Sequence, residues 1–189
     1  MRTLLCGFSI LVLALAFGCP LAAAEMSHGG MDMHHGTDEM LAPLRDLAGR
    51  EFERAFYSMM IPHHEGAVRM SEKILGIAST EKVGKWAQDI IAAQRREIGE
   101  MRAALDKLGG VERHFHDMMD ADMEKMVEGT TDDRSYVELM IPHHESAVRM
   151  AEMAKGRTDD KELLRLADDI VRTQNEEIAA FREWLRGTQ

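Results

Sequence analysis

Thiol chemistry is nearly absent from this sequence. Its 189 residues include two cysteines, Cys6 and Cys19, and both lie in an N-terminal segment that we expect to be removed. The remaining chain would then hold no thiol. That composition excludes a disulfide scaffold, a thiolate zinc site and a cysteine nucleophile.

Positive charge is also in deficit. Lys and Arg number 23 against 33 Asp and Glu, so the formal net charge is −10. No basic stripe is present that could neutralise phosphates, which argues against a nucleic-acid partner. Apolar residues make up 45% of the chain, enough for a folded core, and the length favours one domain or two small ones.

Several enzyme motifs are missing as well. The chain has no P-loop, no glycine-rich dinucleotide turn and no nucleophile elbow. His64-Glu65 is not followed by a second histidine at the spacing of a zinc protease. The Glu-x-x-His spacing of di-iron bundles occurs only from Glu25 to His28, before the helical part of the chain. We therefore expect that the protein is not an enzyme.

The N-terminus has the order of a secretory signal peptide. Arg2 supplies a positive charge, an apolar run covers residues 8–17, and small residues stand at Ala22 and Ala24. The apolar run is too short to span a bilayer comfortably. We expect residues 1–24 to be a signal peptide cleaved after Ala24, which places the mature protein in the periplasm or outside the cell.

Two alternatives to this cleavage remain open. In the first, Cys19 is the acylated residue of a lipoprotein, although the bulky Phe17 fits the usual lipoprotein sequence poorly. Only in that case do we expect the protein to attach to a membrane through a lipid. In the second, the apolar run is retained as a signal anchor.

An internal repeat determines the expected architecture. The eleven residues 60–70 recur at 140–150 with ten identities, at a constant offset of 80. The same offset relates further pairs downstream, including Gln94 to Gln174 and Glu97 to Glu177. A register that holds over this span indicates a duplicated unit, which we place at about residues 41–108 and again at about 117–188.

Each unit is predicted to be a helical hairpin. Apolar residues recur with helical spacing, and nothing alternates with a period of two, so we expect no sheet. Two amphipathic hairpins should pair as an all-α four-helix bundle over residues 41–189. The predicted long helices cover residues 51–77, 81–108, 133–155 and 160–186, with short helices at 39–48 and 118–127 that end at Gly49 and Gly129.

Local signals refine these helices. Pro62 and its repeat Pro142 lie inside helical patterns, where proline either kinks the helix or starts a new one. Asp132 is a candidate N-cap for the second unit. Glu65 and Arg69 are expected to form an exposed pair one helical turn apart.

The repeated motif carries the candidate chemistry. At about 100° per residue, both histidines of each copy face the core or its margin, with methionine sulfurs one or two turns away. Imidazole and thioether without thiolate suit copper, since thioether selects Cu(I) and imidazole accepts either oxidation state. The alternative is structural, because methionine often fills gaps in a core. The candidate metal ligands are Met60, His63, His64, Met70, Met140, His143, His144 and Met150.

Two further clusters combine the same side chains. Residues 25–40 have no hydrophobic period and form a Met/His-rich tail that is expected to be flexible, a composition typical of metal binding; the alternative is a leader with incidental Met and His. Between the units, residues 114–126 contain two histidines and four methionines, for which core packing is an equal alternative. The candidate ligands in the tail are His28, Met31, Met33, His34 and His35.

The doubled Met-Ile-Pro-His-His-Glu-x-Ala-Val-Arg-Met motif closely resembles the signature of domain-of-unknown-function family 305, and residues 49–56 resemble its lead-in. The resemblance covers roughly residues 41–185. It implies a ferritin-like four-helix fold and secretion from bacteria, and some members are periplasmic copper-binding proteins that contribute to copper resistance. The second lead-in, residues 129–133, departs from the first and leaves the start of that helix open.

These observations favour an exported protein that sequesters or transfers copper, as Cu(I) or Cu(II), for copper tolerance or homeostasis. Copper ions are the expected cargo, and another periplasmic copper protein is a candidate partner. One alternative is a metal-free helical interaction module whose methionine-rich faces pack against a partner. A weaker one is a redox enzyme with a metal bound in the bundle.

Overall fold

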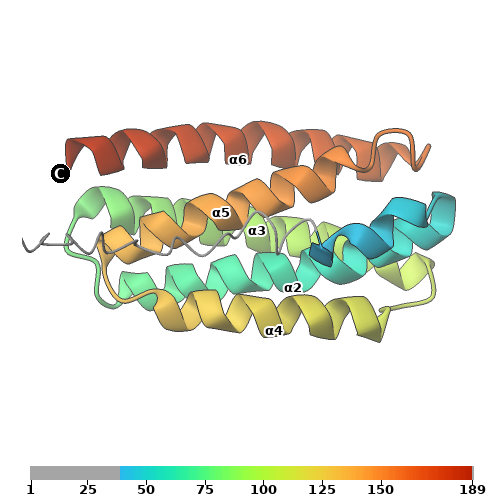
Figure 1. Ribbon diagram of the computed structural model, residues 1–189, viewed down its shortest axis with the longest axis horizontal. Helices are drawn as coiled ribbons and strands as arrows, with labels where there is room; N and C mark the ends of the chain where they lie inside the picture. Colours follow the sequence, from blue (N-terminus) through green and yellow to red (C-terminus); the bar gives the residue numbers. More distant parts are fainter. Residues whose placement is uncertain (1–38, 189) are drawn as a thin grey trace, which may run out of the picture. The chain divides into compact units, whose positions relative to one another are not determined.

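The computed structural model describes residues 39–188, and these residues are almost entirely helical (Figure 1). No strand occurs between residues 39 and 188, so the predicted all-α bundle is confirmed. Within the same residues, no helix is both long and apolar enough to cross a bilayer. The elements are η1 (Ala42–Asp46), α2 (Gly49–Leu75), α3 (Glu81–Lys107), α4 (Arg113–Gly129), α5 (Asp133–Glu152) and α6 (Lys161–Gly187).

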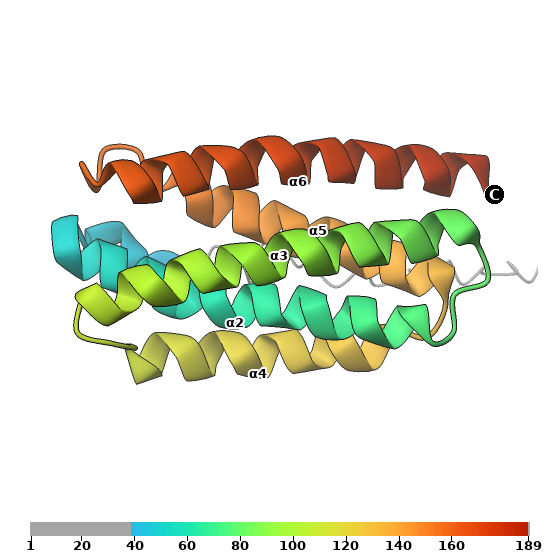
Figure 2. The ribbon, with the colours of Figure 1, turned by 180° about the vertical axis from the view of Figure 1, so that it is seen from behind.

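The two predicted hairpins form the bundle. α2 packs against α3, α5 packs against α6, and α2 packs against α5. In both views, α4 runs along α2 at the outer edge of the bundle (Figure 1 and Figure 2). The side chains that face inward from these helices form one hydrophobic core. The helices that carry the repeated motif, α2 and α5, therefore face each other in its middle.

The segment before α2 differs from its prediction. Residues 39–48 were expected to form a short helix that ends at Gly49, but the structure has a 3-10 helix at Ala42–Asp46, held by the fully buried Leu44. Gly49 instead begins α2, with φ of +54° and its N–H donating to the carbonyl of Arg157 at 2.6 Å. The positive φ turns the chain into α2, a conformation that glycine adopts at little cost.

Two other helix ends differ from their predictions. α4 covers Arg113–Gly129, longer at its start than the predicted 118–127, because it docks along most of α2. α5 ends at Glu152, three residues before the predicted end, and the turn that follows contains Gly156 with φ of +81°. Gly129 is the last residue of α4, as predicted.

Both helices of the repeated motif run through their prolines. α2 is continuous through Pro62 and α5 through Pro142, so the alternative in which proline starts a new helix is wrong. Proline in a helix interior costs about 3 kcal/mol in a lost hydrogen bond and steric strain. The residues around Pro62, including Met60 and His63, are fully buried, and their packing offsets this cost.

Two neighbouring aspartates hold the start of α5. Asp132 is the N-cap, as predicted, and forms a capping box with Ser135. Asp133 accepts hydrogen bonds from the backbone N–H groups of Ser79 and Thr80 and from the Ser79 hydroxyl, at 2.8–3.0 Å. Burial alone would raise the pKa of Asp133, but these hydrogen bonds lower it below the usual value. Asp133 thus ties the turn between α2 and α3 to the second unit.

The predicted pair of Glu65 and Arg69 does not form, so that prediction was wrong. Glu65 pairs with Arg102 of α3, and Arg69 pairs with Asp120 of α4 at 3.1 Å. The reason is that α3 and α4 pack on opposite sides of α2 and offer each side chain a partner from another helix. The Glu65 pairing has a repeat equivalent, in which Glu145 of α5 pairs with Arg182 of α6.

The single mismatch in the eleven-residue repeat follows from the position of α4. Gly66 of α2 lies under Met123 of α4, and a Cβ at Gly66 would lie 2.7 Å from the Cβ and Cγ of Met123. A side chain there would collide, so the close approach of α4 requires glycine. The repeat position on α5 is Ser146, which is only partly buried and directs its hydroxyl to the centre of the bundle.

Candidate functional site

Four imidazoles lie at the centre of the bundle. His63 and His64 of α2 and His143 and His144 of α5 are each at most 1% exposed. The prediction that both histidines of each copy face the core is therefore confirmed. Because histidine is seldom buried without partners for its ring nitrogens, the hydrogen bonds of these four rings determine what they can do.

His63 and His143 lie against each other across the two repeats. Their ring centroids are 3.8 Å apart. The Nε2 of His143 donates to the backbone carbonyl of His63 at 3.0 Å. The hydroxyl of Ser146 donates to the carbonyl of His143, so it accepts from the Nε2 of His63 at 2.6 Å. Both rings therefore carry a proton on Nε2.

The other nitrogen of each ring, Nδ1, can only accept a hydrogen bond or bind a metal. Burial, followed by the neighbouring histidines, lowers the pKa of His63 and of His143 well below the usual value, so both rings are neutral at pH 7. A neutral ring with a proton on Nε2 has a lone pair on Nδ1. Neither Nδ1 has a hydrogen-bond partner among residues 39–188. The arrangement presents two unprotonated nitrogens in the core.

His64 and His144 are oriented by carboxylates from the second helix of each hairpin. The Nε2 of His64 donates to Oε2 of Glu97 at 2.9 Å. The Nε2 of His144 lies 2.8 Å from Oε2 of Glu177, but it is out of line for a hydrogen bond. The offset of 80 relates these two glutamates in the sequence, and in the structure each lies against the second histidine of its own unit. A carboxylate on one nitrogen is the usual way that proteins orient a histidine whose other nitrogen binds metal.

Further polar atoms in this region have no partner in the described part of the chain. They are the Nδ1 atoms of His64 and His144 and the Oε1 atoms of Gln94 and Gln174, one turn before the two glutamates. Each of these side chains is at most 3% exposed. A buried polar atom without a hydrogen bond is costly, and such atoms commonly mark a ligand site.

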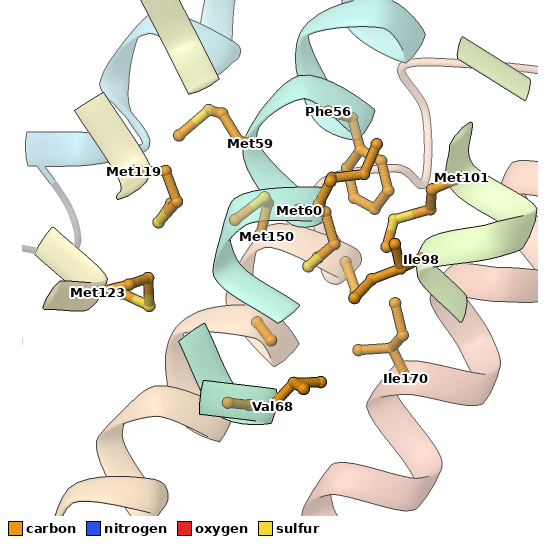
Figure 3. Close-up of a cluster of buried hydrophobic side chains, with 14 of the residues drawn as sticks. Phe56, Met59, Met60, Val68, Ile98, Met101, Met119, Met123, Met150 and Ile170 are labelled. Carbon is orange, nitrogen blue, oxygen red and sulfur yellow. The ribbon is translucent and has the colours of Figure 1, made fainter. Parts of the chain in front are cut away.

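The methionines of the motif are buried on the same two helices as the imidazoles. Met60, Met70, Met140 and Met150 are all fully buried. Figure 3 shows Met60 of α2, Met150 of α5 and Met101 of α3 among the buried side chains of the core. The candidate sulfur ligands therefore come from facing helices of different repeats, an arrangement that spacing within one motif did not predict.

Three histidine, cysteine or acidic side chains do not come together as a metal site anywhere in residues 39–188. The predicted ligands of the tail, His28, Met31, Met33, His34 and His35, lie outside the described residues.

Ser146 was not predicted from the sequence, although a signal for it was present. It occupies the one position where the two motif copies differ, and its hydroxyl fixes the proton on His63. Tyr136 also links the two repeats. Its hydroxyl lies 2.8 Å from that of Ser71 and so joins α5 to α2. Burial raises the pKa of Tyr136, so this phenol stays protonated.

Acid is expected to destabilise the protein below about pH 6.5, the pKa of an ordinary histidine. His63 and His143 stay neutral in the native state because their pKa values are lowered, whereas the unfolded chain binds protons at both. The free energy of unfolding should therefore be constant above about pH 6.5 and fall below it, by about 1.4 kcal/mol per pH unit for each histidine, until the native pKa values are reached.

Urea unfolding at about pH 7.5 and about pH 5.5 measures this loss, because carboxylates with ordinary pKa values remain ionised at both. A variant with His63→Gln and His143→Gln keeps a side-chain N–H donor at each position and should show a smaller pH dependence. Equal free energies of unfolding for the unmodified protein at the two pH values would contradict the neutral, buried state of these rings.

The fold and the site define a class of protein: a duplicated helical hairpin whose facing helices bury two His-His pairs. The sequence profile of the domain of unknown function DUF305 matches residues 20–105 and 109–185. The chain belongs to the DUF305 family.

Solved structures with the same fold include CopM. In its Cu(I)-bound form, CopM is 34% identical to this chain, with a TM-score of 0.61, over 71% of this chain and 96% of CopM. CopM has also been solved in Cu(II)-bound and Ag-bound forms. A DUF305 protein from Streptomyces coelicolor, described as a secreted protein, is 28% identical with a TM-score of 0.62, over 74% of this chain and 93% of that one.

A curated relative is the uncharacterized protein L153 of Acanthamoeba polyphaga mimivirus. It is 43% identical over 55 residues, which are 29% of this chain. The match spans only 36% of the viral protein, so this chain covers about a third of that curated relative.

Proposed function

We propose that the protein is an exported copper-binding protein that sequesters copper or passes it on, with copper as its cargo. The observation that carries this proposal is the pair of unprotonated, unpartnered Nδ1 atoms of His63 and His143 at the centre of a thiol-free bundle, on helices that also carry fully buried methionines. Neutral imidazole and thioether together suit copper better than zinc or iron, which normally recruit thiolate or carboxylate ligands as well.

The comparisons add support from an independent direction. CopM shares 34% of its sequence with this chain and was solved with Cu(I) bound. The Streptomyces coelicolor relative is described as secreted, which agrees with a signal peptide over residues 1–24. The net charge of −10 would attract cations to the protein, an effect that salt weakens.

In our proposal, each group of residues has a separate role in copper binding. His63 and His143 would bind copper through Nδ1, with Ser146 and the carbonyl of His63 fixing the proton on Nε2. His64 would act in the same way with Glu97 as its orienting partner. The methionines of the motif would supply the soft ligands, and the tail over residues 25–40 would capture ions or hand them on.

We propose binding rather than catalysis. The four imidazoles are at most 1% exposed, so an organic substrate cannot contact them in this conformation. A metal-free interaction module remains the second candidate, favoured by the methionines that line the helix interfaces. It predicts a protein partner and no response of stability to copper.

Copper-dependent stabilisation tests the proposal. The chain of residues 25–189 is heated with and without Cu(I) under reducing, oxygen-free conditions, beside a form that begins at residue 41. A ligand that binds only the native state adds RT ln(1 + [L]/Kd), about 2.7 kcal/mol at a free concentration of 100 Kd. We expect a raised Tm in both forms. A Tm that copper leaves unchanged in both would reject the proposal and favour the interaction module.

A further inference from the structure

The most deeply buried side chains of α4 are methionines, with Phe115 and Val127 packed partly buried against the core. Of the 17 residues in this helix, the three that are fully or almost fully buried are Met119, Met123 and Met126, at 1%, 2% and 8% exposed. A helix that only packed against its neighbour would be expected to use leucine and isoleucine as well, since they fill a regular interface with fewer rotamers to lose. The sequence pattern left this cluster undecided between packing and metal binding.

The facing side of α2 adds another thioether. Met59 is fully buried and is not one of the candidate ligands of the His-His centre. Figure 3 shows Met59 extending from α2 toward α4, while Met119 and Met123 extend from α4 toward α2. The sulfur of Met123 lies directly against the backbone of α2, 3.0 Å from where a Cβ of Gly66 would stand.

This arrangement exists only in the first repeat. The repeat positions of Met59 and Gly66 on α5 are Leu139 and Ser146, and neither reproduces the feature. It is therefore an addition to the duplicated unit rather than part of it. Charged side chains close its outer edge, where Arg69 pairs with Asp120 at 3.1 Å and approaches Glu124 at 3.6 Å. The net charge of that edge is negative.

We propose that Met59, Met119 and Met123 form a second metal site, which we call the thioether site, for a soft monovalent cation such as Cu(I) or Ag(I). Thioethers are neutral and soft, so they bind these ions and discriminate against zinc, magnesium and other harder divalent ions. The unbranched, flexible side chains can close around an ion without moving either helix. An all-sulfur environment favours the monovalent state of copper.

The thioether site goes beyond the proposed function, because it shares no residue with the repeated motif. It predicts that the protein holds one soft ion more than the His-His centre and the tail account for. It also predicts that this ion survives changes to the histidines. The two proposals can therefore fail separately.

The test counts bound Ag(I), which is redox-stable, by native mass spectrometry of residues 25–189. The double variant Met119→Leu and Met123→Leu keeps the apolar volume between α2 and α4 and removes two sulfurs. We expect it to bind one Ag(I) ion fewer per chain, and Met59→Leu on the opposite helix to lose the same ion. Met118→Leu on the half-buried flank of α4 is the matched control and should bind the full number.

Variants of the other site complete the test. The variant with His63→Gln and His143→Gln should retain the ion of the thioether site, which would then be lost when Met119 and Met123 are also replaced. An unchanged Ag(I) count in both the Met59 and the Met119/Met123 variants would overturn the proposal. So would an equal loss in the Met118 control.

Discussion

Replacing His64 by alanine is expected to lower the free energy of unfolding by about 3–5 kcal/mol, because it removes a partner from a buried carboxylate. The Nε2 of His64 donates to Glu97 at 2.9 Å, and the side chain of Glu97 is only 7% exposed. Without the imidazole, Oε2 of Glu97 has neither its hydrogen bond nor access to water, since Arg96 reaches only Oε1, at 3.4 Å, and a cavity remains beside it.

The second repeat supplies a matched control. His144 is equally buried, but its partner Glu177 has a side chain that is 28% exposed and can turn to water. His144→Ala should therefore cost less than His64→Ala, by about 1–2 kcal/mol, even though both create a similar cavity. Urea unfolding of the two variants gives the comparison.

A double variant separates the two contributions. If the unpaired carboxylate carries the extra cost, adding Glu97→Leu to His64→Ala should recover at least about 1 kcal/mol, since it removes the group that was left unpaired. Adding Glu177→Leu to His144→Ala should recover little. Equal costs for the two alanine variants, with no recovery from Glu97→Leu, would show that Glu97 does not depend on His64.

The sequence carried enough information for the architecture because the repeat and the helical period agree. The offset of 80 places the two His-His motifs on equivalent helices, and the apolar stripe around Met60 turns them inward. Glu97 could be anticipated for the same reason, since it repeats as Glu177 on the second helix of each hairpin. Local periodicity thus predicted which side chains are buried.

Contacts between helices could not be predicted from the helical periodicity. The pairing of Glu65 with Arg102, in place of Arg69, depends on where α3 and α4 pack, which no period in α2 specifies. The proton on Nε2 of His63 depends on Ser146 from the other repeat. The predicted length of α4 was too short because this helix is stabilised by packing against α2 rather than by a strong periodic pattern of its own.

The largest effect on copper is expected from the two histidines that face each other. His63→Gln and His143→Gln together remove both Nδ1 lone pairs, while each glutamine can still donate an N–H to the hydroxyl of Ser146 or the carbonyl of His63. The core is therefore expected to keep its hydrogen bonds and lose two ligands. Loss of the two Nδ1 ligands should lower the affinity for Cu(I) by at least about 100-fold, or about 2.7 kcal/mol.

A matched control distinguishes a lost ligand from a disturbed bundle. His116→Gln changes a partly exposed histidine on α4, outside the His-His centre, and should leave the affinity unchanged. Thermal unfolding of the metal-free proteins should give similar Tm values for the double variant and the unmodified chain at about pH 7.5, where native and unfolded histidines are both mainly neutral.

The measurement that tests the central claim most directly is a competitive Cu(I) titration of residues 41–189 against a chromophoric chelator, with and without the two glutamine substitutions. Both proteins carry Met119→Leu and Met123→Leu, so that the thioether site does not contribute. We predict tight binding by the protein that keeps His63 and His143 and a loss of affinity of at least about 100-fold when both are glutamine. Equal affinities for the two proteins would contradict a copper site at His63 and His143 and would assign these buried rings a structural role alone.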